Sequence, residues 1–293
     1  QLLLQANLDD KKTIGVMSSL PIMGFQPNQM QMMQGQRPQD KWVILSELEK
    51  TYNLQEIKTD VKDIADGIDI LFLIHPKGLS ELTQYAIDQF VLRGGELVVL
   101  VDANSRIDQA AMAASGMRGM GETSSDLDKL FAHWGVDYES TKILGDIDRA
   151  TPLNFGGAIG VLSYALWHSL NSESFNQDVI ATKELENMMM VEPGAFLLKE
   201  DSPLKVEPLI SSTTNSSLIE GMMTRYSRPP DINAKVVSGG KQYYLAGVLS
   251  GDLTSAFAKR PESPKPKEGE QKPEEETSQS TPKPHVAKSK EMA

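Results

Sequence analysis

The sequence predicts an α/β protein with a mostly parallel sheet and helices on both faces, followed by an α+β extension with short strands and a hairpin. Over residues 11–145, short apolar runs alternate with amphipathic stretches, as in proteins whose strands alternate with helices. Two runs, residues 68–74 and 96–101, are almost continuously apolar. Such runs are typical of strands that helices cover on both faces, which favours parallel pairing.

The elements of the first half follow in order along the chain. Asp40 can cap one helix, and Ser80 can cap a second that Gly94 and Gly95 would end. Ser125 opens a capping-box pattern before a third helix. Four strands are predicted around these helices, at residues 13–17, 54–57, 68–74 and 96–101.

The second half has weaker patterns and is predicted to continue the same core. Glycines between its last two apolar runs can supply the positive φ angles of a tight hairpin turn. The predicted strands are residues 179–182, 196–198 and 206–210, with a hairpin of 234–237 and 243–249.

These patterns divide the chain into four parts. Residues 261–293 are rich in proline and charge and hold few large apolar side chains, a composition that cannot offset the entropy of ordering. We therefore expect a linker (1–10), an α/β domain (11–145), an α+β continuation (146–260) and a disordered linker (261–293).

Composition excludes several classes of function. The net charge of −11 argues against binding of nucleic acid through phosphate neutralisation. There is no cysteine, and the four histidines lack the helical spacing of metal ligands. The glycine-rich nucleotide motif does not follow the first strand, where Pro21 stands instead. We predict no metal and no cofactor, and no stretch reaches the roughly 18–20 apolar residues of a membrane span.

A polar edge is the first candidate site. Ligands of open α/β sheets bind beyond the carboxyl ends of the strands, so polar residues there can form a ligand or partner edge. The alternative is that they are ordinary loop residues that end strands and cap helices. The residues concerned are Ser18, Ser19, His75, Lys77, Asp102 and Asn104.

A loop rich in glutamine, methionine and proline is the second candidate. It contains Met30, Met32 and Met33, whose thioethers are soft enough to bind Cu(I). Because no histidine or cysteine accompanies them, we favour an adaptable surface for a partner protein, or disorder.

Several blocks of sequence together resemble one known family. Residues 74–80 (IHPKGLS) and 85–95 (YAIDQFVLRGG) are the most specific of them. The chain is similar over residues 11–257 to the auxiliary component of ABC-type transport systems related to gliding motility. The remaining matching blocks are residues 13–21, 100–102, 208–217, 244–251 and 255–257.

The resemblance implies a setting that composition does not show. Members are membrane-anchored, periplasmic proteins of the inner membrane of Gram-negative bacteria, encoded with an ATPase and a permease. Their extracytoplasmic domain resembles the glutamine amidotransferase-like fold without its nucleophile. A polysaccharide or a periplasmic protein is a further partner, and the family continues beyond this chain into a membrane helix.

Three functions follow as hypotheses. We favour a non-catalytic binding domain of an ABC-type transport system. The alternative is a hydrolase of glycans or peptides that uses Asp102 and His75 as acid and base, and a third hypothesis is a dimerisation module. Asp146 and Asp148 stand two residues apart, and we interpret them as surface aspartates rather than a catalytic pair.

Overall fold

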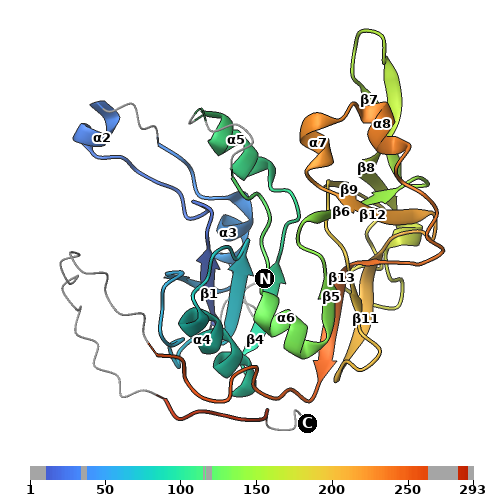
Figure 1. Cartoon of the computed structure of the whole chain (residues 1–293). Coiled ribbons are helices and arrows are strands. Elements are labelled where there is room, and N and C mark those ends of the chain that lie inside the picture. Colours follow the sequence, from blue (N-terminus) through green and yellow to red (C-terminus); the bar gives the residue numbers. More distant parts are fainter. Residues whose placement is uncertain (1–10, 34–37, 115, 117–120, 263–282, 290–293) are drawn as a thin grey trace, which may run out of the picture. The chain divides into compact units, whose positions relative to one another are not determined.

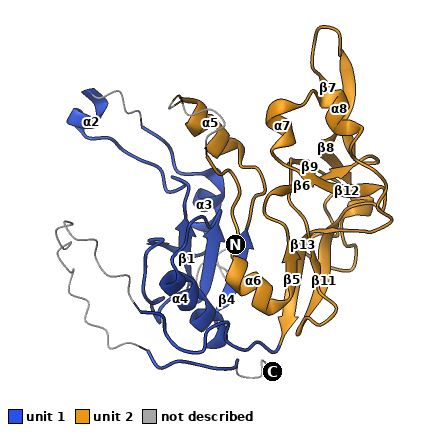
Figure 2. Cartoon of the chain, viewed as in Figure 1, with its two compact units in different colours: residues 1–100, 252–293 blue, residues 101–251 orange. Residues whose placement is uncertain are grey.

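The structure is a computed structural model that describes residues 11–33, 38–114, 116, 121–262 and 283–289 (Figure 1). Its contacts divide the chain into two compact units (Figure 2). Unit 1 holds residues 1–100 and 252–293, and unit 2 holds residues 101–251. The chain therefore leaves unit 1 at the end of a strand and later returns to it.

Unit 1 is built on a four-stranded sheet in which every pair of neighbours is parallel. The strand order is β2-β1-β3-β4, which confirms the predicted parallel α/β architecture. All four predicted strands form, within two residues of the expected bounds at each end. They are β1 (Thr13–Ser18), β2 (Asn53–Ile57), β3 (Ile70–Ile74) and β4 (Glu96–Leu100).

One face of this sheet packs against a short helix. Leu45 of α3 is fully buried and clusters with alternate residues of β1 and β3, as the period of two along a strand requires. The predicted cover of both faces is wrong for β4. No residue of β4 is buried, and Val98 and Leu100 are 44% and 46% exposed; β4 is also an edge strand that pairs only with β3 in this sheet.

The helices of unit 1 confirm one predicted cap and correct another. The Ser80 hydroxyl accepts a hydrogen bond from the backbone N–H of Thr83 (3.1 Å), which satisfies a donor at the start of α4. Asp40 caps nothing, since α3 begins after Trp42. The helices are α2 (Gln29–Met33), α3 (Val43–Leu48) and α4 (Glu81–Leu92).

The end of the described chain returns to unit 1. Residues 283–289, which we call the return segment, lie within the stretch predicted to be a disordered linker. The Gln89 side chain accepts from the backbone N–H of Val286 (2.6 Å) and donates to its carbonyl (2.9 Å). Thr254 and Lys288 form an antiparallel bridge. The segment is therefore held on α4 by hydrogen bonds to its backbone, which do not require large apolar side chains.

Unit 2 is dominated by antiparallel strands. They form a four-stranded sheet (β11-β13-β10-β5), a three-stranded sheet (β7-β8-β9) and a pair (β12-β6). The strands are β5 (Val136–Tyr138), β6 (Lys142–Asp146), β7 (Ala150–Asn154), β8 (Val161–Asn171), β9 (Asn187–Val191), β10 (Phe196–Leu198), β11 (Leu204–Ser211), β12 (Ser216–Glu220) and β13 (Tyr244–Gly251).

The helices of unit 2 are short, and η2 is a 3-10 turn. Gly135 ends α6 in the left-handed conformation (φ 70°), which is the usual role of glycine after a helix. The elements are α5 (Arg106–Ala114), α6 (Asp128–Trp134), η2 (Ser172–Ser174), α7 (Met223–Tyr226) and α8 (Pro229–Asn233).

Three local predictions for unit 2 are wrong. Residues 179–182 form turns rather than a strand. Residues 234–237 follow α8 without pairing as a strand, so the predicted hairpin is absent and β13 pairs with β10 and β11 instead. Ser125 does not cap α6, because its hydroxyl accepts from the backbone N–H of Asp102 (2.9 Å). For Ser125 and for the missing hairpin, a contact distant in sequence overrides a local preference.

Candidate functional site

The sheet of unit 1 has a switch point between β1 and β3. The chain leaves β1 toward β2 on one side and continues at β3 on the other, and such points are where open α/β sheets bind ligands. Here the Ser19 hydroxyl donates a hydrogen bond to the carbonyl of His75. The structure thus brings together two of the predicted edge residues, from the loops after β1 and β3.

The other polar residues at this edge of the sheet either make hydrogen bonds to the backbone or lie in the adjoining loop. His75 is buried, has a positive φ of 50° and donates its backbone N–H to the Leu100 carbonyl (2.8 Å). The Ser18 hydroxyl accepts from the backbone N–H of Leu20 (3.0 Å). Lys77 is half-buried in the loop after β3. A strained, buried residue at a switch point is typical of a functional edge.

A pocket of about 510 Å³ opens beside this point, at the carboxyl ends of β1 and β2. Ser18 contributes to it from the predicted edge, and Glu56, Lys58 and Asp60 come from the end of β2 and the loop that follows. Sequence reasoning missed these three residues. The rule that selected the other strand ends also applies to β2, so the signal was present in the sequence.

The other two predicted edge residues, Asp102 and Asn104, belong to unit 2. The Asp102 carboxylate accepts from the backbone N–H of Asn104 (2.8 Å), a local turn contact. Asp102 is the group that the hydrolase hypothesis assigned to acid–base chemistry together with His75.

Asn104 instead belongs to a buried polar cluster around Glu192. Its side-chain amide donates to the Glu192 carboxylate (2.6 Å) and to the Thr224 hydroxyl (3.2 Å). Its side-chain oxygen accepts from the Thr123 hydroxyl (2.9 Å). Arg106 approaches the other carboxylate oxygen of Glu192 at 3.3 Å. We call these five residues the Glu192 cluster.

The Glu192 backbone is strained as well as buried. Glu192 is 3% exposed and has a φ of 51°, although it precedes Pro193, a position that normally keeps the residue before it extended. Burial raises the pKa of Glu192, and the Arg106 charge opposes this shift. Burial together with the Glu192 charge raises the pKa of Tyr164 to about 12. Sequence patterns did not indicate this cluster, because its members come from four separate segments.

The pKa of Glu192 gives a testable pH dependence. The pKa of Glu192 is raised in the folded protein above its ordinary value of 4.5. At any pH between the unfolded-state pKa and the folded-state pKa, Glu192 therefore binds more protons in the folded protein than in the unfolded chain. Its contribution to stability therefore falls as pH rises through that window. We expect the stability of Glu192→Gln relative to wild type to improve as pH rises from about 4 to about 7, measured by urea unfolding at several pH values.

Glu173→Gln is the matched control for this measurement. A hydrogen bond from Arg149 lowers the pKa of Glu173, so its stabilisation is lost as pH falls. The stability of Glu173→Gln relative to wild type is therefore expected to improve as pH falls below 4.5 and to stay nearly level above it. Parallel behaviour of the two variants would contradict the assignment.

The predicted partner loop carries a short helix. Asn28 and Gln31 exchange hydrogen bonds between side chain and backbone (2.8 and 2.9 Å), a reciprocal cap that starts α2. At the base of the loop, Phe25 and Gln39 exchange two backbone hydrogen bonds (2.8 and 2.9 Å). We call the described residues 25–33 and 38–39 the methionine arm; α2 stands away from the sheet of unit 1 (Figure 1).

The arm exposes three thioethers to solvent. Met30, Met32 and Met33 are 71%, 54% and 85% exposed, and no residue of α2 is buried. Flexible, apolar methionine side chains are suited to packing against a partner. In the part of the chain that the structure describes, no group of histidine, aspartate and glutamate side chains is arranged to hold a metal ion.

Comparison with known proteins identifies the family. A family model described as an "ABC-type uncharacterized transport system" matches residues 11–288. The chain belongs to this family. No curated protein and no solved structure shows significant similarity to it.

Membership makes the chain an auxiliary component of an ABC-type transport system. The family match includes residues of both units and reaches into the return segment. Among the helices that the structure describes, none is both long enough and apolar enough to cross a membrane.

Proposed function

We propose that this auxiliary component is a non-catalytic, extracytoplasmic binding domain of the transport system, related to the gliding-motility type. It works at the periplasmic face of the inner membrane, in a longer protein anchored in that membrane. Its fold corresponds to the amidotransferase-like α/β class without a nucleophile. The chain has no cysteine, and the Asp102 carboxylate is engaged by a backbone N–H.

The methionine arm is the observation that carries this proposal. It holds three exposed methionines on a base fixed by paired backbone hydrogen bonds, so it combines a defined position with an adaptable contact surface. The partner is the permease subunit of the transporter, which joins the component to the ATPase. The pocket at the carboxyl edge is a second surface, available to a periplasmic protein or a polysaccharide.

Substitution of the arm tests the docking step. In the full-length membrane-anchored protein, Met30→Ser, Met32→Ser and Met33→Ser together are expected to reduce recovery of the permease by about tenfold or more, since they remove the apolar contact. The measurement is quantitative mass spectrometry of the permease and ATPase after purification from membranes.

A double variant in unit 2 is the control. Met189→Ser and Met222→Ser change methionines that are also largely exposed, at 57% and 67%, and they should leave recovery unchanged. Equal loss in both variants, or absence of permease and ATPase with the wild-type protein, would overturn the proposal. Digestion of the domain by protease added to spheroplasts tests its periplasmic location, and resistance there would contradict it.

A further inference from the structure

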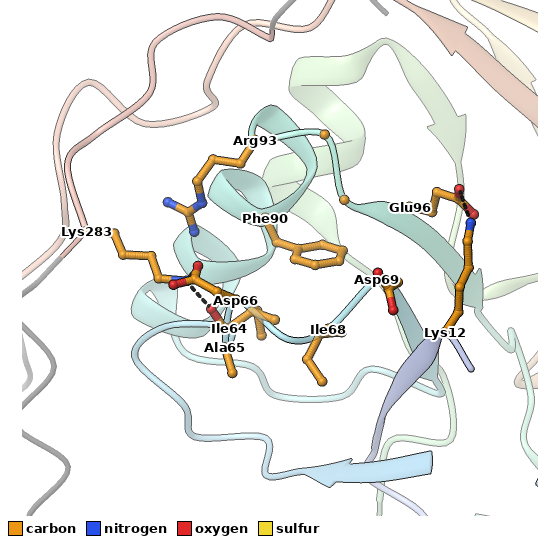
Figure 3. A pocket seen from close by; sticks show the side chains of 12 residues that line it. Lys12, Ile64, Ala65, Asp66, Ile68, Asp69, Phe90, Arg93, Glu96 and Lys283 are labelled. Atoms are coloured by element: carbon orange, nitrogen blue, oxygen red, sulfur yellow. Dashed lines mark hydrogen bonds and ion pairs between the residues drawn. The ribbon is translucent and has the colours of Figure 1, made fainter. Parts of the chain in front are cut away.

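A second pocket, of about 360 Å³, lies at the amino-terminal edge of the parallel sheet (Figure 3). It is separate from the carboxyl edge, because its residues precede or begin the strands. Ile64, Ile68 and Phe90 are buried and form its apolar floor. The charged residues around it are Lys12, Asp66, Asp69, Arg93, Glu96 and Lys283.

Two glycines allow this pocket to form between α4 and β4. Gly94 turns the chain with a φ of 95°, which a side chain would disfavour. A Cβ atom at Gly95 would lie 2.3 Å from the Phe90 ring. The missing side chain therefore lets the ring lie against the start of β4 and line the pocket.

One wall of the pocket comes from the return segment. The Lys283 ammonium donates to the Ile64 carbonyl (2.8 Å) and pairs with Asp66. Its side chain is only 20% exposed. Gln89 fixes the same segment on α4 through the backbone of Val286, so Lys283 is held in place beside the pocket.

The charges are separated across the floor. Figure 3 shows Arg93 and Lys283 on one side of the Phe90 ring, and Asp69 and Glu96 on the other. Among the described residues, the Arg93 guanidinium makes no hydrogen bond or salt bridge, although its charge helps to lower the pKa of the nearby Asp66, whereas Lys283 is paired directly with Asp66. Arg93 is therefore the cation available to an incoming anion.

The opposite side offers two carboxylates. One Asp69 oxygen accepts from the backbone N–H of Thr13 (2.7 Å), which leaves the second oxygen for another donor. Glu96 lies 3.4 Å from Lys12, and both side chains are more than half exposed, so this ion pair contributes little and is readily exchanged.

We propose that this pocket binds a small zwitterion with a carboxylate at one end and an ammonium at the other. The carboxylate pairs with Arg93, and the ammonium lies between Asp69 and Glu96. The carbon chain between the charges covers Phe90. The site is independent of the docking function proposed above, which involves the methionine arm.

An NMR titration of the whole chain tests the site. The probes are 6-aminohexanoate, hexanoate and hexylamine, which share a carbon chain and differ in their end groups. We expect 6-aminohexanoate to bind at least about tenfold more tightly than either single-charge analogue, with shifts concentrated at residues 64–69 and 93–96. Equal binding of hexanoate, or no shifts up to about 10 mM ligand, would overturn the proposal.

Variants locate the binding groups. Arg93→Ala is expected to weaken 6-aminohexanoate binding about tenfold or more. Arg93→Lys is expected to weaken it less, because lysine keeps the positive charge but lacks the planar guanidinium group. Arg228→Ala removes an arginine from unit 2 that is paired with Asp231 (2.9 Å), and it should have no effect. An Arg93→Ala protein that retains wild-type folded spectra and wild-type affinity would contradict the site.

Discussion

Asp146→Ala is expected to lower the free energy of unfolding by about 3–5 kcal/mol. The Asp146 carboxylate is fully buried and accepts four hydrogen bonds. Three come from the backbone N–H groups of Asp148 (3.0 Å), Arg149 (3.3 Å) and Thr213 (2.7 Å), and one from the Thr213 hydroxyl (2.8 Å). Alanine would leave these donors without a partner in a buried site.

Asp148→Ala is the control, because it removes the same kind of side chain two residues further on. Asp148 is exposed and accepts one side-chain hydrogen bond, from Asn215 (3.0 Å), so its loss should cost less than about 1 kcal/mol. Urea unfolding curves measure both effects. Equal midpoints for the two variants would contradict the role of Asp146. The interpretation of both residues as surface aspartates is wrong for Asp146, whose burial depends on the distant loop around Thr213.

Gln89→Ala is expected to release the return segment from α4. Gln89 is buried and makes two hydrogen bonds to the backbone of Val286. We expect hydrogen exchange of the amides at residues 286–289 to accelerate by about tenfold or more. Loss of the Gln89 hydrogen bonds is expected to cost roughly 1.4 kcal/mol of local stability, which corresponds to a tenfold faster exchange rate. Mass spectrometry of exchanged peptides measures the effect.

Gln84→Ala is the matched control on the same helix. The Gln84 side chain donates to the Leu79 carbonyl (3.2 Å), at the start of α4 and away from the return segment's backbone. Exchange at residues 286–289 should stay at the wild-type rate in this variant. If Gln89→Ala leaves those amides as protected as in wild type, the Gln89 contacts do not hold the segment.

The parallel sheet was predictable because its strands are encoded locally. The apolar run of β3 is buried at four of its five residues, and the runs of β1 and β4 pair with it as expected. The exposure of Val98 and Leu100 was not predictable, because the pattern of β4 resembles that of β3. Whether helices cover an apolar strand depends on the rest of the chain. The apolar pattern of the strand itself does not predict it.

The candidate sites show the same division between local and distant information. Ser19 and His75 were selected because strand ends are visible in the sequence, and their contact depends only on neighbouring parallel strands. Glu192 was missed because its partners Asn104 and Thr224 come from distant segments. The short helix α2 was also missed, although the spacing of Asn28 and Gln31 is a recognisable cap.

The return segment has a consequence for a cleaved molecule. Both ends of the stretch 263–282 adjoin residues that are bound to α4: Asp88 accepts from Ser255 (2.7 Å) and from Ala256 (3.1 Å), and Gln89 holds Val286. A nick between these ends therefore leaves two polypeptides joined by hydrogen bonds, by side-chain packing and by ion pairs such as that of Lys283 with Asp66. Such a nicked protein should elute as one particle in gel filtration and separate into two bands under denaturing electrophoresis.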